Sequence, residues 1–180
     1  MTARGRRYVA LLRGINLGNH NKVPMAELRG IVGDIGCTDV ATYIQSGNVV
    51  ATSTLAAKSL AGRLESALEE RFGFRPRTMV RTASEIGDVL AKNPFADQDT
   101  NKVHVGFLTG PLGRNSTVPT VAESGADRAM IIGAHVYLYY PTGVGRTKMT
   151  QTPMWRAINE DCTVRNWRTV TKLAEMADVN

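Results

Sequence analysis

Short apolar runs alternate with segments of helical periodicity along the first half of the chain. A continuous apolar run at residues 8–12 is typical of a buried central strand. Apolar residues three and four apart predict one helix over residues 24–35 and a second over about residues 55–72. A glycine follows each predicted helix, and glycine readily adopts the conformation in which helices end.

A predicted β-hairpin lies between these two helices. Residues 42–45 and 48–51 flank Ser46-Gly47, which predicts a two-residue turn with glycine at positive φ. Residues 75–81 form a further predicted strand after the second helix. The resulting order of elements, β-α-β-β-α-β, is the split βαβ or ferredoxin-like pattern.

The second half of the chain repeats this pattern loosely. A short helix near residues 84–91 precedes a predicted strand at residues 103–108. A stretch rich in Gly, Pro and Ser over residues 110–119 stands where the first helix of a second unit would be, so any helix there is short. The remaining predicted elements are a hairpin of residues 128–132 and 135–140 and two helices at residues 152–159 and 163–177.

Size and composition agree with a globular protein. The 180 residues are 43% hydrophobic and 21% charged, which excludes a coiled coil, a disordered tail and a disulfide miniprotein. A chain of this size buries roughly 70% of the surface that its unfolded form exposes, which is enough for a core. We predict an α+β fold of two ferredoxin-like (split βαβ) plaits packed together, the second irregular, with subdomains at residues 1–82 and 83–180.

Cysteine usage and hydropathy bear on the cellular setting. Cys37 and Cys162 form no CxxC pair, so they predict buried free thiols rather than a zinc site or a redox motif. No apolar run approaches 18 residues, and the run at residues 8–12 is too short for a signal peptide. We expect a cytoplasmic protein with no membrane partner; its oligomeric state stays open.

The net charge of +6 is concentrated in two segments. Residues 1–22 carry five basic residues and no acidic one, and residues 141–172 carry six basic and two acidic residues. A local positive field favours a phosphate or carboxylate partner. The alternative is that the arginines at positions 4, 6 and 7 belong to a solvated chain end.

The first candidate site combines two polar loops. In a split βαβ unit, the loop after the first strand and the turn of the following hairpin emerge at the same end of the sheet. Many N–H donors, two fixed positive charges and no carboxylate suit an anionic or amide-bearing ligand better than a metal. The alternative is that the amides fix turns. The candidate residues are Arg13, Asn16, Asn19, His20, Asn21 and Lys22 from the first loop, and Gln45, Ser46 and Asn48 from the second.

The second candidate site is the glycine-rich loop over residues 141–150, with Arg146 and Lys148 two positions apart. It has neither the Walker A spacing nor that of a dinucleotide-binding loop. Backbone amides and two bases can still hold a phosphate, or the loop simply connects two elements. In the predicted last helix, positions 165, 168, 169 and 172 form a basic stripe that either tracks phosphates or is solvated, and Asn166 lies beside it.

Catalytic signatures are weak. His104 and His135 lie in or at predicted strands and are expected to be structural, so only His20 is a candidate acid or base. No serine occupies a nucleophile elbow, and no His, Asp or Glu cluster has metal-ligand spacing. We therefore predict no metal and no cofactor.

Several segments resemble a bacterial family called domain of unknown function 1697. The resembling segments are residues 8–18, 21–28, 42–50, 145–148 and 165–173, and the match covers nearly the whole chain. The resemblance implies a cytoplasmic α+β protein of two ferredoxin-like subdomains and implies no activity. Where a relative has Gly-Gly, this chain has Gly18-Asn19. The family motifs fall on Arg13, Gly14, Asn16, Lys22, Gln45, Ser46, Gly47, Asn48, Gly145, Arg146, Lys148, Asn166 and Trp167.

Three classes of function follow from these patterns. The first is a binding module for an anionic ligand, a nucleotide or a nucleic-acid backbone, whose phosphate contacts are Arg13, Lys22, Arg146 and Lys148. In the first strand only Tyr8 is available for stacking, so the aromatic pair of an RNA-recognition motif is absent. The second is an enzyme acting on a small anionic metabolite, with His20 or Ser46 in proton transfer. The third is a structural or protein-interaction domain.

Overall fold

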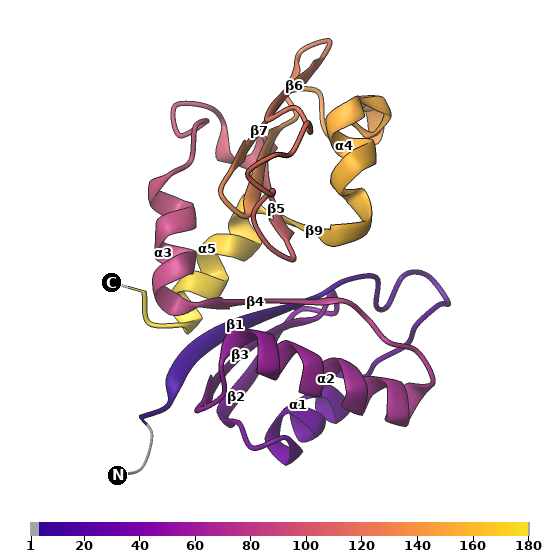
Figure 1. Cartoon of the computed structure of the whole chain (residues 1–180), viewed down its shortest axis with the longest axis vertical. Helices are drawn as coiled ribbons and strands as arrows, with labels where there is room; N and C mark the ends of the chain where they lie inside the picture. The colour runs from indigo at the N-terminus through magenta and orange to yellow at the C-terminus, as the bar shows by residue number, and fades with distance from the viewer. Residues whose placement is uncertain (1–3, 180) are drawn as a thin grey trace. The chain divides into compact units, whose positions relative to one another are not determined.

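A computed structural model describes residues 4–179 of the chain (Figure 1). The fold is α+β, with two antiparallel sheets and five α-helices in the described residues. The chain divides into two compact units: one comprises the described residues up to Asp88 and those from Lys172 onward, and the other is Val89–Thr171. The outermost residues of the predicted subdomains, 1–3 and 180, lie outside the described part of the chain.

The first unit has the predicted order of elements. Its sheet has the strand order β2-β3-β1-β4, and every neighbouring pair is antiparallel. Leu11 pairs with Asn48, and Leu12 pairs with Thr78, so the end of the first strand lies beside the starts of the third and fourth. The elements are β1 (Arg6–Leu12), α1 (Met25–Asp34), β2 (Thr38–Tyr43), β3 (Asn48–Ser53), α2 (Ala57–Phe72) and β4 (Thr78–Thr82).

The core of this unit lies between one face of the sheet and the helices α1 and α2 (Figure 1). Side chains alternate between the two faces of a strand, so Tyr8, Ala10 and Leu12 of β1 share the helix-covered face. The Tyr8 hydroxyl donates to the Leu55 carbonyl at 2.9 Å, which satisfies the one polar atom of that side chain. The helices contribute Leu28 and Val32 from α1 and Leu60, Leu64 and Leu68 from α2.

The hairpin between β2 and β3 differs from the prediction. Its turn has four residues, 44–47, rather than two, and Tyr43 pairs directly with Asn48. Ile44 and Gln45 therefore lie in the turn and not in a strand. The physical reason is the buried Asn48 side chain, whose Nδ2 donates to the Tyr43 carbonyl and to Ser46 Oγ, both at 2.9 Å, and so closes the longer turn.

The second unit has a five-stranded sheet with the order β6-β7-β8-β5-β9. Within it, β7-β8-β5-β9 repeats the order β2-β3-β1-β4 of the first unit, with β6 added at the edge. The boundaries between the units fall inside α3 (Ala83–Ala91) and α5 (Trp167–Met176). The other elements are β5 (Val103–Leu108), β6 (Val121–Ser124), β7 (Asp127–Ile132), β8 (His135–Tyr139), α4 (Pro153–Ile158) and β9 (Cys162–Asn166), with short 3₁₀ helices at Thr100–Lys102, Val144–Arg146, Met149–Gln151 and Asn159–Asp161.

Two strands of this unit were not predicted. The segment expected to begin the last helix is instead β9, and its Val164 pairs with Gly106 of β5. Long-range strand pairing thus overrides the helical period that this segment shares with α5. Asn166 fixes the true start of α5, because its Oδ1 accepts a hydrogen bond from the backbone N–H of Thr169 at 2.8 Å. The short strand β6 was missed as well.

This correction removes the predicted basic stripe. Arg165 lies in β9 with 7% of its surface exposed, so it does not share a helix face with Arg168 and Lys172. Thr169, the other member of the stripe, is buried. The exposed face of α5 therefore has fewer cations than the sequence pattern indicated.

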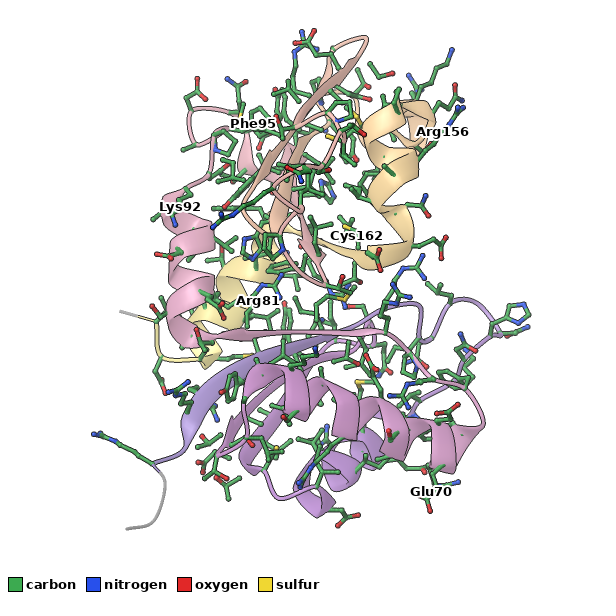
Figure 2. The ribbon with its side chains drawn as sticks, viewed as in Figure 1. Glu70, Arg81, Lys92, Phe95, Arg156 and Cys162 are labelled. Atoms are coloured by element: carbon green, nitrogen blue, oxygen red, sulfur yellow. The ribbon has the colours of Figure 1, made fainter. Side chains whose placement is uncertain are left out.

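The two cysteines are buried free thiols, as the sequence predicted, and Cys162 lies at the start of β9 (Figure 2). Cys162 packs with Met149, Met154 and Ile158 in the core of the second unit. In residues 4–179, no helix combines the length and the apolar character needed to cross a bilayer.

Candidate functional site

Two polar segments meet at one end of the first sheet: the loop of residues 13–24 after β1, and the turn of residues 44–47 between β2 and β3. The backbone N–H of Leu12 donates to the Gly47 carbonyl at 2.9 Å. Asn16 Nδ2 donates to the Gln45 carbonyl at 2.8 Å. The two segments that the sequence analysis combined into one candidate site are therefore hydrogen-bonded to each other.

Asn16 is the central residue of this loop pair. Besides Gln45, its Nδ2 donates to the Val23 carbonyl at 3.0 Å, and its Oδ1 accepts from the Val23 N–H at 2.9 Å. Its own N–H donates to the Asn21 carbonyl at 2.9 Å. The residue has a φ of 53°, a conformation that asparagine tolerates better than most residues. The Asn16 amide thus builds the frame of the site.

Two further asparagines have similar roles. Asn21, with a φ of 52°, donates from Nδ2 to the Gly14 carbonyl at 2.9 Å. Asn48 is fully buried and holds the hairpin turn through Tyr43 and Ser46. These bonds favour the interpretation that the asparagines fix the turns, so any ligand contact has to come from their neighbours.

Four polar side chains at this end are exposed and make no hydrogen bond or ion pair with the part of the chain that the structure describes. They are Asn19, His20, Lys22 and Gln45. Neither loop contains a carboxylate. The edge therefore presents N–H donors and the Lys22 cation to solvent.

A third segment, residues 73–77 between α2 and β4, reaches the same end of the sheet. The backbone N–H of Arg13 donates to the Arg77 carbonyl at 2.8 Å. Arg13 is half-buried and Arg77 is exposed. This hydrogen bond joins the backbones of two basic residues at this end of the sheet.

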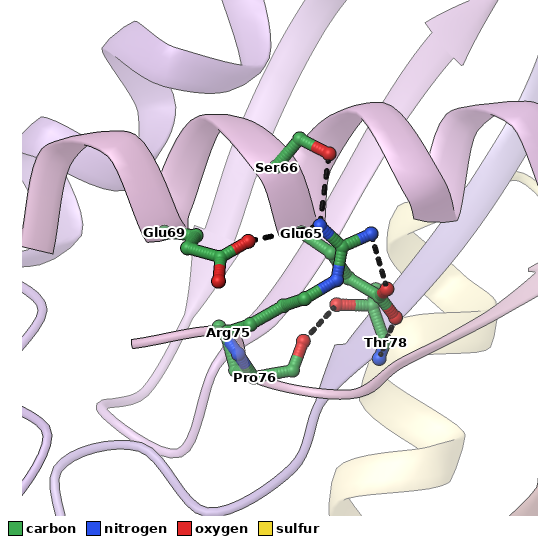
Figure 3. Close-up of polar contacts among 6 residues, drawn as sticks. All are labelled: Glu65, Ser66, Glu69, Arg75, Pro76 and Thr78. Carbon is green, nitrogen blue, oxygen red and sulfur yellow. Dashed lines mark hydrogen bonds and ion pairs between the residues drawn. The ribbon is translucent and has the colours of Figure 1, made fainter. Parts of the chain in front are cut away.

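The carboxylates beside this segment are engaged by an arginine (Figure 3). Arg75 forms ion pairs with Glu69 at 3.0 Å and with Glu65 at 3.4 Å. Glu65 Oε1 also accepts from the Thr78 N–H at 2.8 Å, which fixes the start of β4. Arg75 offsets one of these two negative charges, and the remaining one lowers the positive potential beside this segment.

Sequence reasoning missed two apolar residues of this edge. Leu17 is 63% exposed and Ile44 is 50% exposed, although both are large aliphatic side chains. Ile44 also has a φ of 50°, which is unfavourable for a β-branched residue. The available signal was that Leu17 is the one apolar residue between positions 16 and 22, where the others are polar or glycine.

The second candidate loop belongs to the other unit and is anchored by a buried acid. Thr147 Oγ1 donates to Asp127 Oδ2 at 2.5 Å and accepts from the Met149 N–H at 3.0 Å. On either side of Thr147, Arg146 and Lys148 are exposed, and neither forms an ion pair with the described residues. The anchor holds the backbone, and the two cations face solvent.

The remaining predicted residue, Asn166, caps α5 at the exposed end of β9. Its neighbour Arg165 is held inside the second unit, where Nη1 donates to Thr163 Oγ1 at 2.8 Å and to the Val164 carbonyl at 2.9 Å. Burial lowers the pKa of Arg165 to about 10, so the guanidinium stays charged at neutral pH.

Two further features bear on metal binding and on acid–base chemistry. Within residues 4–179, no three histidine, cysteine or carboxylate groups gather closely enough to hold a metal ion. His20 stands alone as an exposed imidazole in the loop of residues 13–24, where no carboxylate is present to orient it.

His104 should make stability depend on pH. Its Nδ1 is buried and has no hydrogen-bond partner among the described residues. Burial lowers the pKa of His104 below its ordinary value of 6.5, against a smaller opposing effect of a hydrogen bond with the Lys102 backbone. As the pH falls below 6.5, the unfolded chain takes up the proton first, so the free energy of unfolding decreases.

Urea unfolding at several pH values below neutral measures this contribution, and His104→Phe should flatten the profile over that range. Parallel profiles for the wild type and His104→Phe would show that another group is responsible.

Comparison with known proteins adds a family but no activity. No curated protein matches the chain. A solved structure, described as the conserved bacterial protein SP0830 from Streptococcus pneumoniae, is similar with a TM-score of 0.77 and 26% sequence identity over 97% of this chain and 99% of that chain. The family profile described as "Protein of unknown function (DUF1697)" matches residues 6–137, which include β1 and the hairpin of the first candidate site. The chain therefore belongs to the DUF1697 family.

Proposed function

We propose that this protein binds the phosphate backbone of a nucleic acid. The observation that carries the proposal is the end of the first sheet, where the side chains of Lys22, His20 and Gln45 are exposed and make no hydrogen bond or ion pair with the described residues, on a loop pair that has no carboxylate. Lysine ammonium groups and side-chain amides donate hydrogen bonds to phosphate oxygens, and no carboxylate in these loops repels the phosphate.

Preorganisation supports this proposal. The hydrogen bond between Asn16 and Gln45 holds the two loops in one arrangement before any ligand arrives, which lowers the entropic cost of binding. The helix α1 begins directly after the first loop, and its N-cap residue, Pro24, makes no side-chain hydrogen bond to the first turn. Glu27 in the first turn is ion-paired with Arg71 at 2.6 Å, so the positive end of the helix dipole still adds to the field of Lys22.

The loop of residues 141–150 is a second proposed phosphate contact. Arg146 and Lys148 flank the anchored Thr147, and both are exposed without an ion pair to the described residues. Their charge acts on phosphates regardless of base sequence, as expected for backbone contacts.

The fold is compatible with such a role. We infer that both units are ferredoxin-like plaits, on the basis of the repeated antiparallel order β2-β3-β1-β4 and β7-β8-β5-β9. In the second unit, α4 precedes the last strand, and the stretch rich in Gly and Pro replaces the first helix. This fold hosts many functions, so the argument for binding depends on the exposed side chains and not on the fold.

The salt dependence of binding tests the proposal. Labelled single- and double-stranded oligonucleotides are titrated at several salt concentrations, and the affinity of the wild type should fall steeply as salt rises. Lys22→Ala should make the slope of log affinity against log salt shallower by about one, and Arg146→Ala/Lys148→Ala by about one to two, because each lost contact releases one fewer counterion.

Lys58→Ala/Arg63→Ala is the matched control. Both residues are exposed on α2 without an ion pair to the described residues, and Lys58 lies in the first turn, near the end of the sheet opposite to the loops. This control removes the same charge as the Arg146/Lys148 variant and should leave the slope unchanged. No binding at low salt, or an equal loss in the control, would contradict the proposal.

A further inference from the structure

Ile44 has an unusual backbone conformation for its residue type. Its φ of 50° lies in the left-handed region, where the branched Cβ of isoleucine crowds the backbone. Glycine or asparagine would occupy this position with less strain. Since the side chain is also 50% exposed, little burial compensates for the strain. Strain of this kind collects at functional positions, where an exposed group is held for a ligand.

Leu17 is presented in a comparable way by the other loop. The turn of residues 17–20 is closed by the hydrogen bond from the His20 N–H to the Leu17 carbonyl at 2.9 Å, and Leu17 is 63% exposed at its start. Asn16 and Gln45, which precede Leu17 and follow Ile44, are joined by the 2.8 Å hydrogen bond. The two apolar side chains therefore belong to one edge of the molecule.

The chemistry around these side chains narrows the choice of ligand. Lys22 and His20 supply the polar groups near Leu17, and the two loops contain no acid. A ligand that fits this edge needs negative charge together with apolar faces. Free phosphate has no apolar face, and a duplex hides the faces of its bases by stacking. A single strand offers both phosphates and accessible base faces.

We propose that the loop pair binds single-stranded nucleic acid, with the bases packed against Leu17 and Ile44 and the phosphates near Lys22. This inference rests on the proposed function and adds the form of the nucleic acid and the side chains that contact it. The aliphatic side chains replace the stacking aromatics that β1 lacks, where Tyr8 is buried in the core.

The test compares three probes of equal length, about twelve nucleotides, which is within the site size of single-strand binding modules. They are a thymidine strand, an abasic strand with the same phosphates, and a duplex. The wild type should bind the thymidine strand most tightly. Ile44→Gly and Leu17→Ser should each weaken binding of the thymidine strand by about fivefold to tenfold, because apolar contact is lost, and should leave binding of the abasic strand unchanged.

Ile44→Gly also carries its own control for folding. Glycine relieves the strain at positive φ, so the melting temperature should rise by about 2–4 °C while the affinity falls. Loss of affinity in a more stable protein cannot come from unfolding. Val121→Ser, at a position 52% exposed on β6, removes an exposed apolar side chain that belongs to the other unit and to neither loop, and this variant should bind all probes as the wild type does.

The outcomes separate this inference from the proposed function. If Ile44→Gly and Leu17→Ser bind the thymidine strand as the wild type does while Lys22→Ala still weakens binding, the base contacts are refuted and phosphate binding stands. If the wild type binds the duplex more tightly than the thymidine strand, or binds the abasic and thymidine strands equally, the single-strand inference is refuted and phosphate binding stands. If no probe binds at low salt, the proposed function itself fails.

Discussion

Asn16→Asp should lower the free energy of unfolding by about 2–3 kcal/mol, because it removes two donated hydrogen bonds and aims an oxygen at two carbonyl groups. Asparagine and aspartate have the same shape, so the change isolates the chemistry of one group. In the wild type, Nδ2 donates to Val23 and Gln45. In the variant, a carboxylate oxygen would face both acceptors without a proton to share.

Urea unfolding measures this loss, and Asn19→Asp is the matched control. Asn19 lies in the same loop, is exposed, and makes no side-chain hydrogen bond with the described residues. The control adds the same negative charge near Lys22, so both variants should weaken nucleic-acid binding, but Asn19→Asp should change stability by no more than about 0.5 kcal/mol. Equal losses of stability would show that Asn16 is not the residue that holds the loops.

The two loops contain six residues with positive φ among those described: Gly14, Asn16, Gly18, Asn21, Ile44 and Gly47. Four of them are glycines and asparagines of the first loop, and these residue types adopt such conformations at little cost. The exception is Ile44. A loop selected for stability alone would have glycine or asparagine at that position. Isoleucine at a positive φ goes against the backbone preference of its residue type, and such exceptions are common at functional sites.

Local signals predicted much of the fold. The strand β5 was predicted with its observed bounds, and α2 ends at Phe72 before Gly73, whose φ is 77°. A continuous apolar run and a terminal glycine act within a few residues, so the sequence alone contains the necessary information.

Pairing between distant segments limited the prediction elsewhere. The residues of β9 fit the helical period that continues into α5, and only their pairing with β5 decides for a strand. The length of the β2–β3 turn depends on the Asn48 side chain reaching Tyr43 and Ser46. Neither fact can be read from periodicity, because both depend on which groups meet after the chain has folded.

The candidate site shows the same division. Strand topology indicates that the two loops share an end of the sheet. Asn16 and Gln45 carry the same amide group, so composition could not distinguish their roles. The Asn16 amide is hydrogen-bonded within the loops, whereas the Gln45 side chain is exposed. The assignment depends on the positive φ of Asn16, which turns its side chain toward Val23.

Gly106→Ala should lower the free energy of unfolding by about 3 kcal/mol, the upper end of the range for overpacked cores. Replacing glycine in a strand usually stabilises a protein, because the unfolded chain loses entropy. Here the sign reverses, since a Cβ on Gly106 would collide with Val136 Cγ1 of β8 and lie 2.6 Å from Cys162 Sγ of β9. Both neighbours are buried in the core of the second unit and have little room to move.

A second substitution, at Val136, tests whether the collision itself causes the loss of stability. Val136→Ala alone creates a cavity, whereas in the Gly106→Ala background it makes room for the new methyl group, so the double variant should lose at least about 1 kcal/mol less than the sum of the single variants. Gly30→Ala is the control, because a Cβ there meets nothing within 4 Å on the exposed face of α1 and should stabilise the protein by about 0.5–1 kcal/mol. Strict additivity of Gly106→Ala and Val136→Ala in urea unfolding would refute the collision with Val136 and would leave the contact with Cys162 Sγ as the cause of the loss.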